Sequence, residues 1–285
     1  MDKQDLIQKA ADFIQNSEGN YVSKQAAISE RSVGMKIYEE PIFGFGSADD
    51  GYFIEFKDPS VIGEHFLAPR EWLPGARTVV SFFLPFSEAV RKGNLEDAAW
   101  PSEGWLHGRI EGQAFLNQLC AFLRSELIDT GYNSLAPSLD GRFWSKAAYN
   151  ADTPHPGASF TSNWSERHAA FVCGLGTFGL SKGLITAKGI AGRFGSVITE
   201  LYLPPDPRGY DEVYGYCTMC GSCVKNCPVR AISLEEGKKH PVCSRFLDRT
   251  SEKYKPRYGC GKCQVGVPCE AGIPEKPAAG EQAGF

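Results

Sequence analysis

The segment CTMCGSCVKNCP, residues 217–228, constrains the fold of this 285-residue chain more than any other segment. Its four cysteines are separated by two, two and three residues, and a proline follows the last of them. Such short intervals bring several thiols to one centre, so the backbone must fold tightly around whatever they bind. The chain has ten cysteines and no recognisable secretory signal, which favours metal binding over a disulfide framework.

This spacing is that of bacterial-type ferredoxins, in which three thiolates hold one [4Fe-4S] cluster and the fourth holds a neighbouring cluster. A second group is therefore expected, and residues 243–269 contain four more cysteines. We predict one cluster on Cys217, Cys220, Cys223 and Cys269, and another on Cys227, Cys243, Cys260 and Cys263. Cys243 is expected to follow a helix. A pair of zinc sites is the alternative, because C-x-x-C pairs also build zinc ribbons.

The charge of the chain is uneven. Residues 1–216 hold 19 basic and 27 acidic side chains, whereas residues 217–285 hold 11 and 7. A nucleic-acid-binding surface normally needs a dense basic face, which the acidic excess of the first part does not favour. No apolar run reaches the ~18 residues of a membrane-spanning helix, so we expect a cytoplasmic protein without a membrane segment.

The residues before the cysteine-rich tail show a mixed α/β pattern. An amphipathic helix is expected within residues 1–16 and a buried strand at 79–86. A long helix is expected from about Trp105 to Asp129, with Gly131 as its stop.

The segment PPDPRGYDE, residues 204–212, is the best candidate for a domain boundary, because it holds three prolines and a glycine. We therefore predict two domains, residues 1–205 and 206–285. Two cysteines of the first domain, Cys120 and Cys173, lie in apolar stretches and are expected to be buried and inert.

Residues 162–203 are rich in glycine. Gly174, Gly176 and Gly179 form a G-x-G-x-x-G pattern with Glu200 downstream, as in a dinucleotide-binding fingerprint. That fingerprint requires a strand before it and a helix after it, whereas the preceding segment ERHAAF is typical of a helix. The glycines are better explained by backbone wrapped closely around a ligand, or by a run of tight hairpin turns.

Several segments together resemble the cobalamin-dependent iron–sulfur reductases, which include epoxyqueuosine reductases and, more distantly, reductive dehalogenases. They are WLPGARTVVSFFLPF, SERHAAFVCGLGTFGLSKGLIT, GSVITELYLP and the eight-cysteine tail, over about residues 65–285. The resemblance implies a nitroreductase-like α/β domain that holds cobalamin base-off and a C-terminal ferredoxin-like domain with two [4Fe-4S] clusters. It implies that cobalamin is contacted by Gly174, Leu175, Gly176, Thr177, Phe178, Gly179, Leu180, Ser181, Gly183, Leu184, Ile185, Thr186, Gly195, Ser196 and Val197.

The chain departs from that family at its proton donor. Epoxyqueuosine reductases carry an aspartate six residues before a Glu-Arg pair, and this position is Phe160 here. Arg193 is similar to the arginine that reductive dehalogenases use beside a proton-donating tyrosine. We therefore expect Tyr149, Asn163 and Arg193 to form the catalytic group, although Tyr149 is also explained as a plain loop residue. The tRNA-binding helical-repeat domain of epoxyqueuosine reductases is not expected, so tRNA is a poor candidate substrate.

The sequence around the histidines also predicts that cobalamin is bound base-off. The Asp-x-His-x-x-Gly pattern that places a histidine beneath cobalt is absent around His65, His107, His155, His168 and His240. A bound cobalamin is therefore expected to have no lower ligand from the protein.

These features predict a reductase in which two [4Fe-4S] clusters feed electrons to a base-off corrinoid that reduces a small molecule by dehalogenation or epoxide-type reduction. The alternatives are a non-enzymatic corrinoid-reducing carrier and an electron-transfer protein with FMN in the first domain. A low-potential ferredoxin or flavodoxin is the expected electron donor, and the sequence allows a homodimer.

Overall fold

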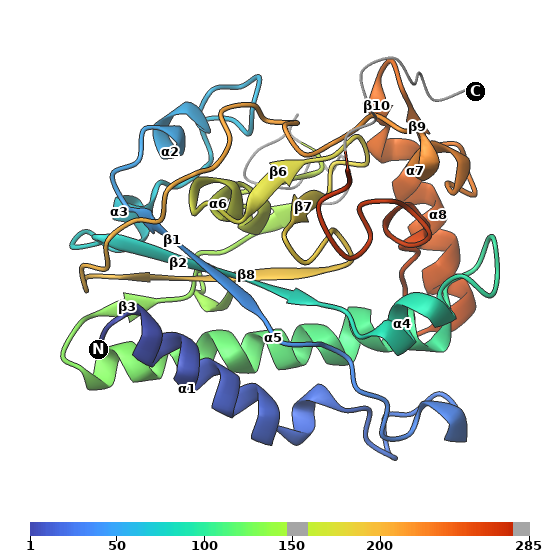
Figure 1. Cartoon of the computed structure of the whole chain (residues 1–285), viewed down its shortest axis with the longest axis horizontal. Helices are drawn as coiled ribbons and strands as arrows, with labels where there is room; N and C mark the ends of the chain where they lie inside the picture. Colours follow the sequence, from blue (N-terminus) through green and yellow to red (C-terminus); the bar gives the residue numbers. More distant parts are fainter. Residues whose placement is uncertain (147–158, 276–285) are drawn as a thin grey trace.

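A four-stranded antiparallel sheet, in the order β1-β2-β8-β3, forms the centre of the computed structural model, which describes residues 1–146 and 159–275 (Figure 1). The strands are β1 (Ile42–Ser47), β2 (Thr78–Pro85), β3 (Ser134–Leu135) and β8 (Gly192–Thr199). Every residue of β2 is buried, because other elements cover both faces of the sheet. The buried strand predicted at 79–86 is confirmed.

Two long helices cover one face of the sheet (Figure 1). Helix α1 (Lys3–Asn16) buries Leu6, Ala10 and Ile14, and helix α5 (Glu103–Asp129) runs beneath β2 and β8. Helix α5 begins after Ser102, whose hydroxyl accepts the amide of Trp105 at 3.1 Å. It ends before Gly131, whose φ of +91° suits glycine. Both predicted helices are confirmed.

Shorter elements cover the other face. They are α2 (Tyr52–Glu55), α3 (Pro69–Trp72), α6 (Glu166–Val172) and the hairpin of β6 (Gly176–Phe178) and β7 (Leu184–Thr186). Alternate strand residues enter two hydrophobic cores: Val80 and Val197 face α1 and α5, whereas Val79 and Ile198 face α6. The sheet is therefore buried on both sides although it is antiparallel.

The glycine-rich stretch forms a helix followed by a tight hairpin, which is not the strand-then-helix arrangement of a dinucleotide-binding fingerprint. Helix α6 precedes the glycines, and Gly176 pairs with Thr186 across the hairpin. A Cβ on Gly176 would lie 1.9 Å from the carbonyl oxygen of Ile185, so only glycine fits there. Cys120 and Cys173 are both fully buried, as predicted.

The remaining described elements are short, apart from α8. They are η1 (Glu18–Asn20), η2 (Glu30–Ser32), α4 (Glu88–Gly93), η3 (Pro137–Leu139), β4 (Ser145–Lys146), β5 (Thr161–Ser162), α7 (Ser222–Lys225), β9 (Ile232–Ser233), β10 (Gly237–Lys238), α8 (His240–Tyr254) and η4 (Lys262–Gln264). Within residues 1–146 and 159–275, no helix has both the length and the apolar composition needed to cross a membrane.

The proline-rich segment 204–212 is fastened to the α/β region. Asp206 accepts the backbone amide of Phe45 at 3.0 Å, and the hydroxyl of Tyr210 donates to the carbonyl of Phe171 at 2.6 Å. The chain then crosses to the cysteine-rich region at one end of the sheet (Figure 1). The boundary between two domains at this segment stays a prediction.

The cysteine-rich region is held against α4 and α5 by close contacts. The amide of Asn94 donates to the carbonyl of Cys260 at 3.0 Å, and the buried ammonium of Lys262 donates to the carbonyl of Asn94 at 2.5 Å. Gly261, with φ +69°, lies directly on the indole of Trp105. This packing fixes the position of the backbone between Cys260 and Cys263.

Replacing Gly261 with alanine is expected to disturb that packing. Its Cβ would lie 1.9 Å from the Trp105 ring, so the backbone of the cysteine loop must move. Gly131→Ala is the matched control, because Gly131 also has positive φ but has nothing within 4 Å of a new Cβ. We expect the control to lose about 1 kcal/mol of stability, and Gly261→Ala to lose more and to bind less iron. Thermal unfolding and iron analysis test this; equal losses in both variants would contradict the packing argument.

Candidate functional site

The first predicted group of thiols lines one small cavity. Cys217, Cys220, Cys223 and Cys269 all face it, and Leu180 and Ile190 supply part of its apolar wall. Burial and, to a smaller extent, the three other thiols raise the pKa of Cys269 to about 12. The amide of Ile190 donates to the carbonyl of Cys269 at 2.9 Å, which ties this distant cysteine to the α/β region.

The second predicted group also converges. Burial raises the pKa of Cys260 to about 12. The backbone amide of Lys262 opposes this rise, and Cys263, Cys243 and Cys227 contribute to it. The thiol of Cys227 accepts the amide of Ala231 at 3.1 Å. The two groups adjoin, because Cys263 is, after burial, the largest influence on the pKa of Cys223. Whether each group holds a cluster remains a proposal.

The expectation that Cys243 follows a helix is wrong. The strands β9 and β10 form a hairpin before it, and Gly237 adopts φ +65° next to their turn. Helix α8 begins only at His240, so Cys243 lies in its first turn.

In the described part of the chain, no group of three or more His, Cys, Asp or Glu side chains is placed to hold a single metal ion. In a [4Fe-4S] cluster each thiolate binds a different iron. Four ligands of a cluster therefore stand further apart than four ligands of one zinc ion.

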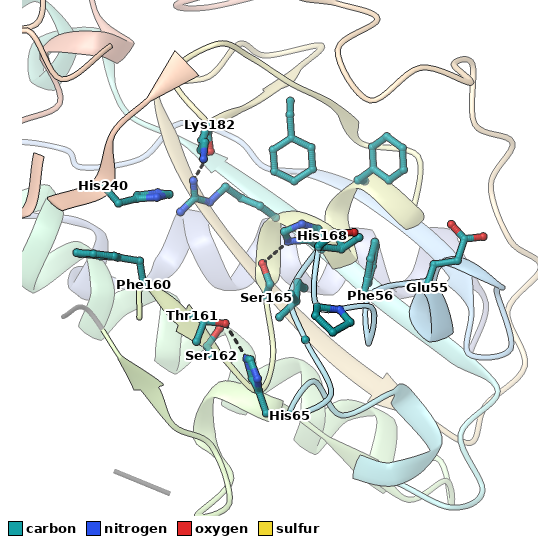
Figure 2. Close-up of a pocket in the computed structure, with 18 of the residues that line it drawn as sticks. Glu55, Phe56, His65, Phe160, Thr161, Ser162, Ser165, His168, Lys182 and His240 are labelled. Carbon is teal, nitrogen blue, oxygen red and sulfur yellow. Dashed lines mark hydrogen bonds between the residues drawn. The ribbon is translucent and has the colours of Figure 1, made fainter. Parts of the chain in front are cut away.

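A large cleft, with a volume of about 1580 Å³, opens between the α/β region and the cysteine-rich region. Its walls come from residues 52–65, strand β5, helix α6, the hairpin and the segment 238–241. Figure 2 shows Phe160, His240 and Lys182 toward one end, and Phe56 and Glu55 toward the other. Aromatic rings and polar side chains alternate around it.

Arg167 links this cleft to the second group of thiols. It lies on α6, lines the cleft and donates to the backbone carbonyl of Lys182. Burial lowers the pKa of Arg167, and the neighbouring Cys263 opposes that effect. The guanidinium therefore stands between the cleft and the cysteine-rich region.

Three histidines line the cleft although the sequence assigned them no role. Burial, assisted by Arg167, lowers the pKa of His168 to about 4, and its Nδ1 lies 2.7 Å from the hydroxyl of Ser165. His65 Nε2 lies 2.8 Å from the hydroxyl of Thr161, and the ring of His240 stacks on Phe160 at 5.4 Å. Dashed lines in Figure 2 mark the two hydrogen bonds.

Glu166 points away from the cleft wall that Arg167 forms. Both of its carboxylate oxygens are buried without a hydrogen-bond partner among the described residues. Burial raises the pKa of this carboxyl to about 7. Glu166 therefore lies inside the α/β region, whereas the adjacent Arg167 lines the cleft.

Two of the predicted catalytic residues, Asn163 and Arg193, lie outside the lining of the cleft. Asn163 is buried, donates to the carbonyl of Arg142 and accepts the amide of Trp144, so its amide group fixes a loop. Arg193 donates to Gln113, and burial lowers its pKa to about 10. Neither residue lines the cleft. Tyr149 lies outside the described residues.

Eight of the fifteen predicted cobalamin-contacting residues fall into three groups. Phe178 lines the cleft, whereas Gly179, Leu180, Ser181 and Ile185 line the cavity of the first thiol group. Gly195, Ser196 and Val197 are buried in the sheet, where Ser196 accepts the indole N–H of Trp164 at 3.0 Å. Sequence reasoning missed Arg167, Lys182 and Lys238, which line the cleft. No local pattern in the sequence singles these residues out, because Arg167 follows Glu166 directly and Lys238 lies close to Glu235 and Glu236.

The buried Glu166 is expected to make stability depend on pH. Its pKa is raised in the folded state, so the folded protein keeps a proton that the unfolded chain loses between pH 4.5 and about 7. Stability should therefore fall by about 3 kcal/mol as pH rises through this window. Glu166→Gln should remove this dependence, whereas Glu55→Gln, at an exposed carboxylate of the cleft, should not. Urea unfolding at pH 5 and pH 8 tests it; parallel pH profiles for wild type and Glu166→Gln would contradict it.

Comparisons with known proteins agree with these features. Residues 212–233 match the family model of a 4Fe-4S binding domain. No curated protein matches the chain. An epoxyqueuosine reductase from Streptococcus thermophilus has a similar structure, with a TM-score of 0.51 and 18% identity over 97% of this chain and 68% of that one.

Two further solved structures share the fold. An epoxyqueuosine reductase with a tRNA-Tyr epoxyqueuosine-modified stem loop gives a TM-score of 0.50 at 20% identity, covering 96% of this chain and 66% of that one. A catabolic reductive dehalogenase gives 0.51 at 15% identity, covering 95% of this chain and 37% of that one. The chain thus spans 66–68% of these epoxyqueuosine reductases and a smaller part of the dehalogenase. The predicted resemblance is confirmed at the level of the fold, which is mixed α/β with a 4Fe-4S-binding segment in its C-terminal part.

Proposed function

We propose that this chain is a reductase of small molecules that holds two [4Fe-4S] clusters and a base-off corrinoid. The observation that carries the proposal is the large cleft, one wall of which belongs to the same region as two adjoining groups of four thiols. Solved epoxyqueuosine reductases and a reductive dehalogenase share the fold, which supports a redox function of this kind.

The thiols fit iron–sulfur clusters by their chemistry. Cysteine ligates metal as thiolate, yet burial and neighbouring thiols raise the pKa of both Cys260 and Cys269 to about 12. Iron ions that replace the thiol protons would supply the positive charge that each group of four cysteines lacks. We assign the cluster on Cys217, Cys220, Cys223 and Cys269 to the outer position and the cluster on Cys227, Cys243, Cys260 and Cys263 to the position beside the cleft.

The cleft fits a large cofactor. Its volume exceeds the ~300–1,000 Å³ typical of sites for drug-sized ligands. Phe56, Phe171 and Phe178 give it apolar surface, and Arg167 and Lys182 give it polar groups near the thiols. When bound, a corrinoid supplies a strongly reducing centre that side chains lack. The base-off state is proposed because the sequence has no histidine in the cobalt-binding pattern.

The residues of this chain have distinct roles in the proposal. The second thiol group would hold the cluster that supplies electrons at the cleft wall, where Arg167 neighbours Cys263. The cleft shelters the reacting atoms from water. Phe160, at the position of the aspartate in the resembling reductases, is neutral and adopts φ +55°. The proton must therefore come from elsewhere, and Tyr149 remains the predicted donor.

The substrate is proposed to be a small molecule. One solved relative contains a modified tRNA stem loop, but the acidic excess of residues 1–216 here is a poor match to a phosphate backbone. A dehalogenase of this fold was solved with 3-bromo-4-hydroxybenzoic acid, which makes this compound a suitable first test. Its reduction would take two electrons and one proton, break the carbon–bromine bond and release bromide.

Turnover of this compound is expected only from protein supplied with cobalamin and a low-potential reductant, without oxygen. Bromide release and 4-hydroxybenzoate formation measure it. An epoxide substrate is tested in parallel, because the fold also serves epoxyqueuosine reductases. Equal turnover with and without cobalamin would overturn the proposal.

The assignment of the outer cluster gives a separate prediction. Cys269→Ser should reduce the iron content from about eight to about four atoms per chain, because each [4Fe-4S] cluster needs four ligands. Cys120→Ala is the matched control, since this thiol is buried in the α/β core and lies in neither group. Iron analysis after anaerobic purification decides; an unchanged iron content in Cys269→Ser would show that this residue is not a ligand.

A further inference from the structure

Three basic side chains converge at the end of the cleft next to the cysteine-rich region. Arg167 comes from α6, Lys182 from the turn between β6 and β7, and Lys238 from β10. All three line the cleft. Figure 2 shows Lys182 and His240 at this end, with Phe160 below His240.

None of the three is neutralised by a carboxylate of the described residues. The guanidinium of Arg167 donates to a neutral acceptor, the backbone carbonyl of Lys182. The next lysine along, Lys239, does pair with an acid, Glu236, and it does not line the cleft. No ion pair within the described residues therefore offsets these three side chains at the cleft.

His240 lines the cleft together with the three cations. Its pKa is lowered to about 4, first by burial and then by Lys182, Lys238 and Arg167. The ring is thus neutral at neutral pH and stacks on Phe160. It offers a hydrogen bond without adding charge.

The acids of the cleft do not compensate. Glu55 and Glu64 both belong to the wall formed by residues 52–65, and Figure 2 shows Glu55 far from Lys182 and His240. Phe160 occupies the position at which the resembling reductases carry a carboxylate. Three like charges in a partly enclosed site repel one another and attract an anion.

We propose that Arg167, Lys182 and Lys238 form a subsite for an oxyanion, either a carboxylate or a phosphate group. A guanidinium binds such groups with two parallel hydrogen bonds, and the two ammonium groups add point charges. The oxyanion is either a group of the substrate or the phosphate in the nucleotide tail of the corrinoid. The naming of these two origins rests on the proposed function, whereas the oxyanion subsite itself does not.

The first experiment measures binding to iron-loaded protein without corrinoid, in buffer free of phosphate and sulfate. Benzoate and benzamide are compared by calorimetry, because they have similar shape and differ in charge. Benzoate should bind at least tenfold more tightly than benzamide. Lys182→Gln and Lys238→Gln should each weaken benzoate binding about tenfold, as expected for one charge-assisted hydrogen bond. Lys239→Gln is the matched control and should bind as wild type does.

The second experiment repeats the titration on protein loaded with cobalamin. Unchanged benzoate affinity assigns the subsite to the substrate, whereas loss of benzoate binding assigns it to the corrinoid phosphate. Three results would overturn the subsite. They are equal affinity for benzoate and benzamide, no binding of either benzoate or inorganic phosphate, and equal effects of the Lys182 and Lys239 substitutions. Failure of cobalamin to bind would overturn the proposed function and leave the first experiment interpretable.

Discussion

The gathering of eight thiols is the constraint on which the C-terminal part of the structure depends. Burial and neighbouring thiols raise the pKa of Cys223, Cys260 and Cys269, so without cations these three resist the ionised form that binds metal. The protein places Lys262, 4% exposed, beside Cys260 and anchors it on the carbonyl of Asn94. The contacts that position the cysteines, from Asn94, Trp105 and Ile190, also fasten the region to the α/β sheet.

That attachment creates the cleft. The hairpin β9–β10 and the start of α8 lie between the second thiol group and the cleft, where they contribute Lys238 and His240. Helix α6 faces them with Arg167, while its neighbour Glu166 is buried toward the sheet. A movement of either region would change the cleft and the environment of the thiols together.

Local sequence patterns predicted much of this arrangement. The periodicity of α5, the apolar run of β2 and the stop at Gly131 are properties of short segments, and they hold in the structure. The cysteine spacing predicted two groups because crossover between clusters is built into that spacing. The prediction of a helix before Cys243 was wrong, because a β-hairpin occupies that stretch. Its strands are only two residues long, so they leave little pattern in the sequence.

The cleft was beyond sequence reasoning because long-range contacts assemble it. Arg167, Lys182 and Lys238 are separated by many residues, share no periodicity and meet only when the cysteine-rich region docks. By resemblance Asn163 and Arg193 are candidate catalytic residues, and this stays a prediction. In the structure the amide group of Asn163 bonds to the backbone of Arg142 and Trp144, and Arg193 donates to Gln113 while its Nε is buried without a partner among the described residues. A polar residue in a family-like position does not reveal whether its partner is a ligand or the protein itself.

The most direct test of the account is the cofactor content of the protein, purified without oxygen from cells supplied with cobalamin. Iron, corrinoid and flavin are measured per chain, together with an absorption spectrum. The account predicts about eight irons, as two [4Fe-4S] clusters require, with one base-off corrinoid and no flavin. The same iron content with flavin, or with no second cofactor, would contradict the corrinoid reductase and leave an electron-transfer protein.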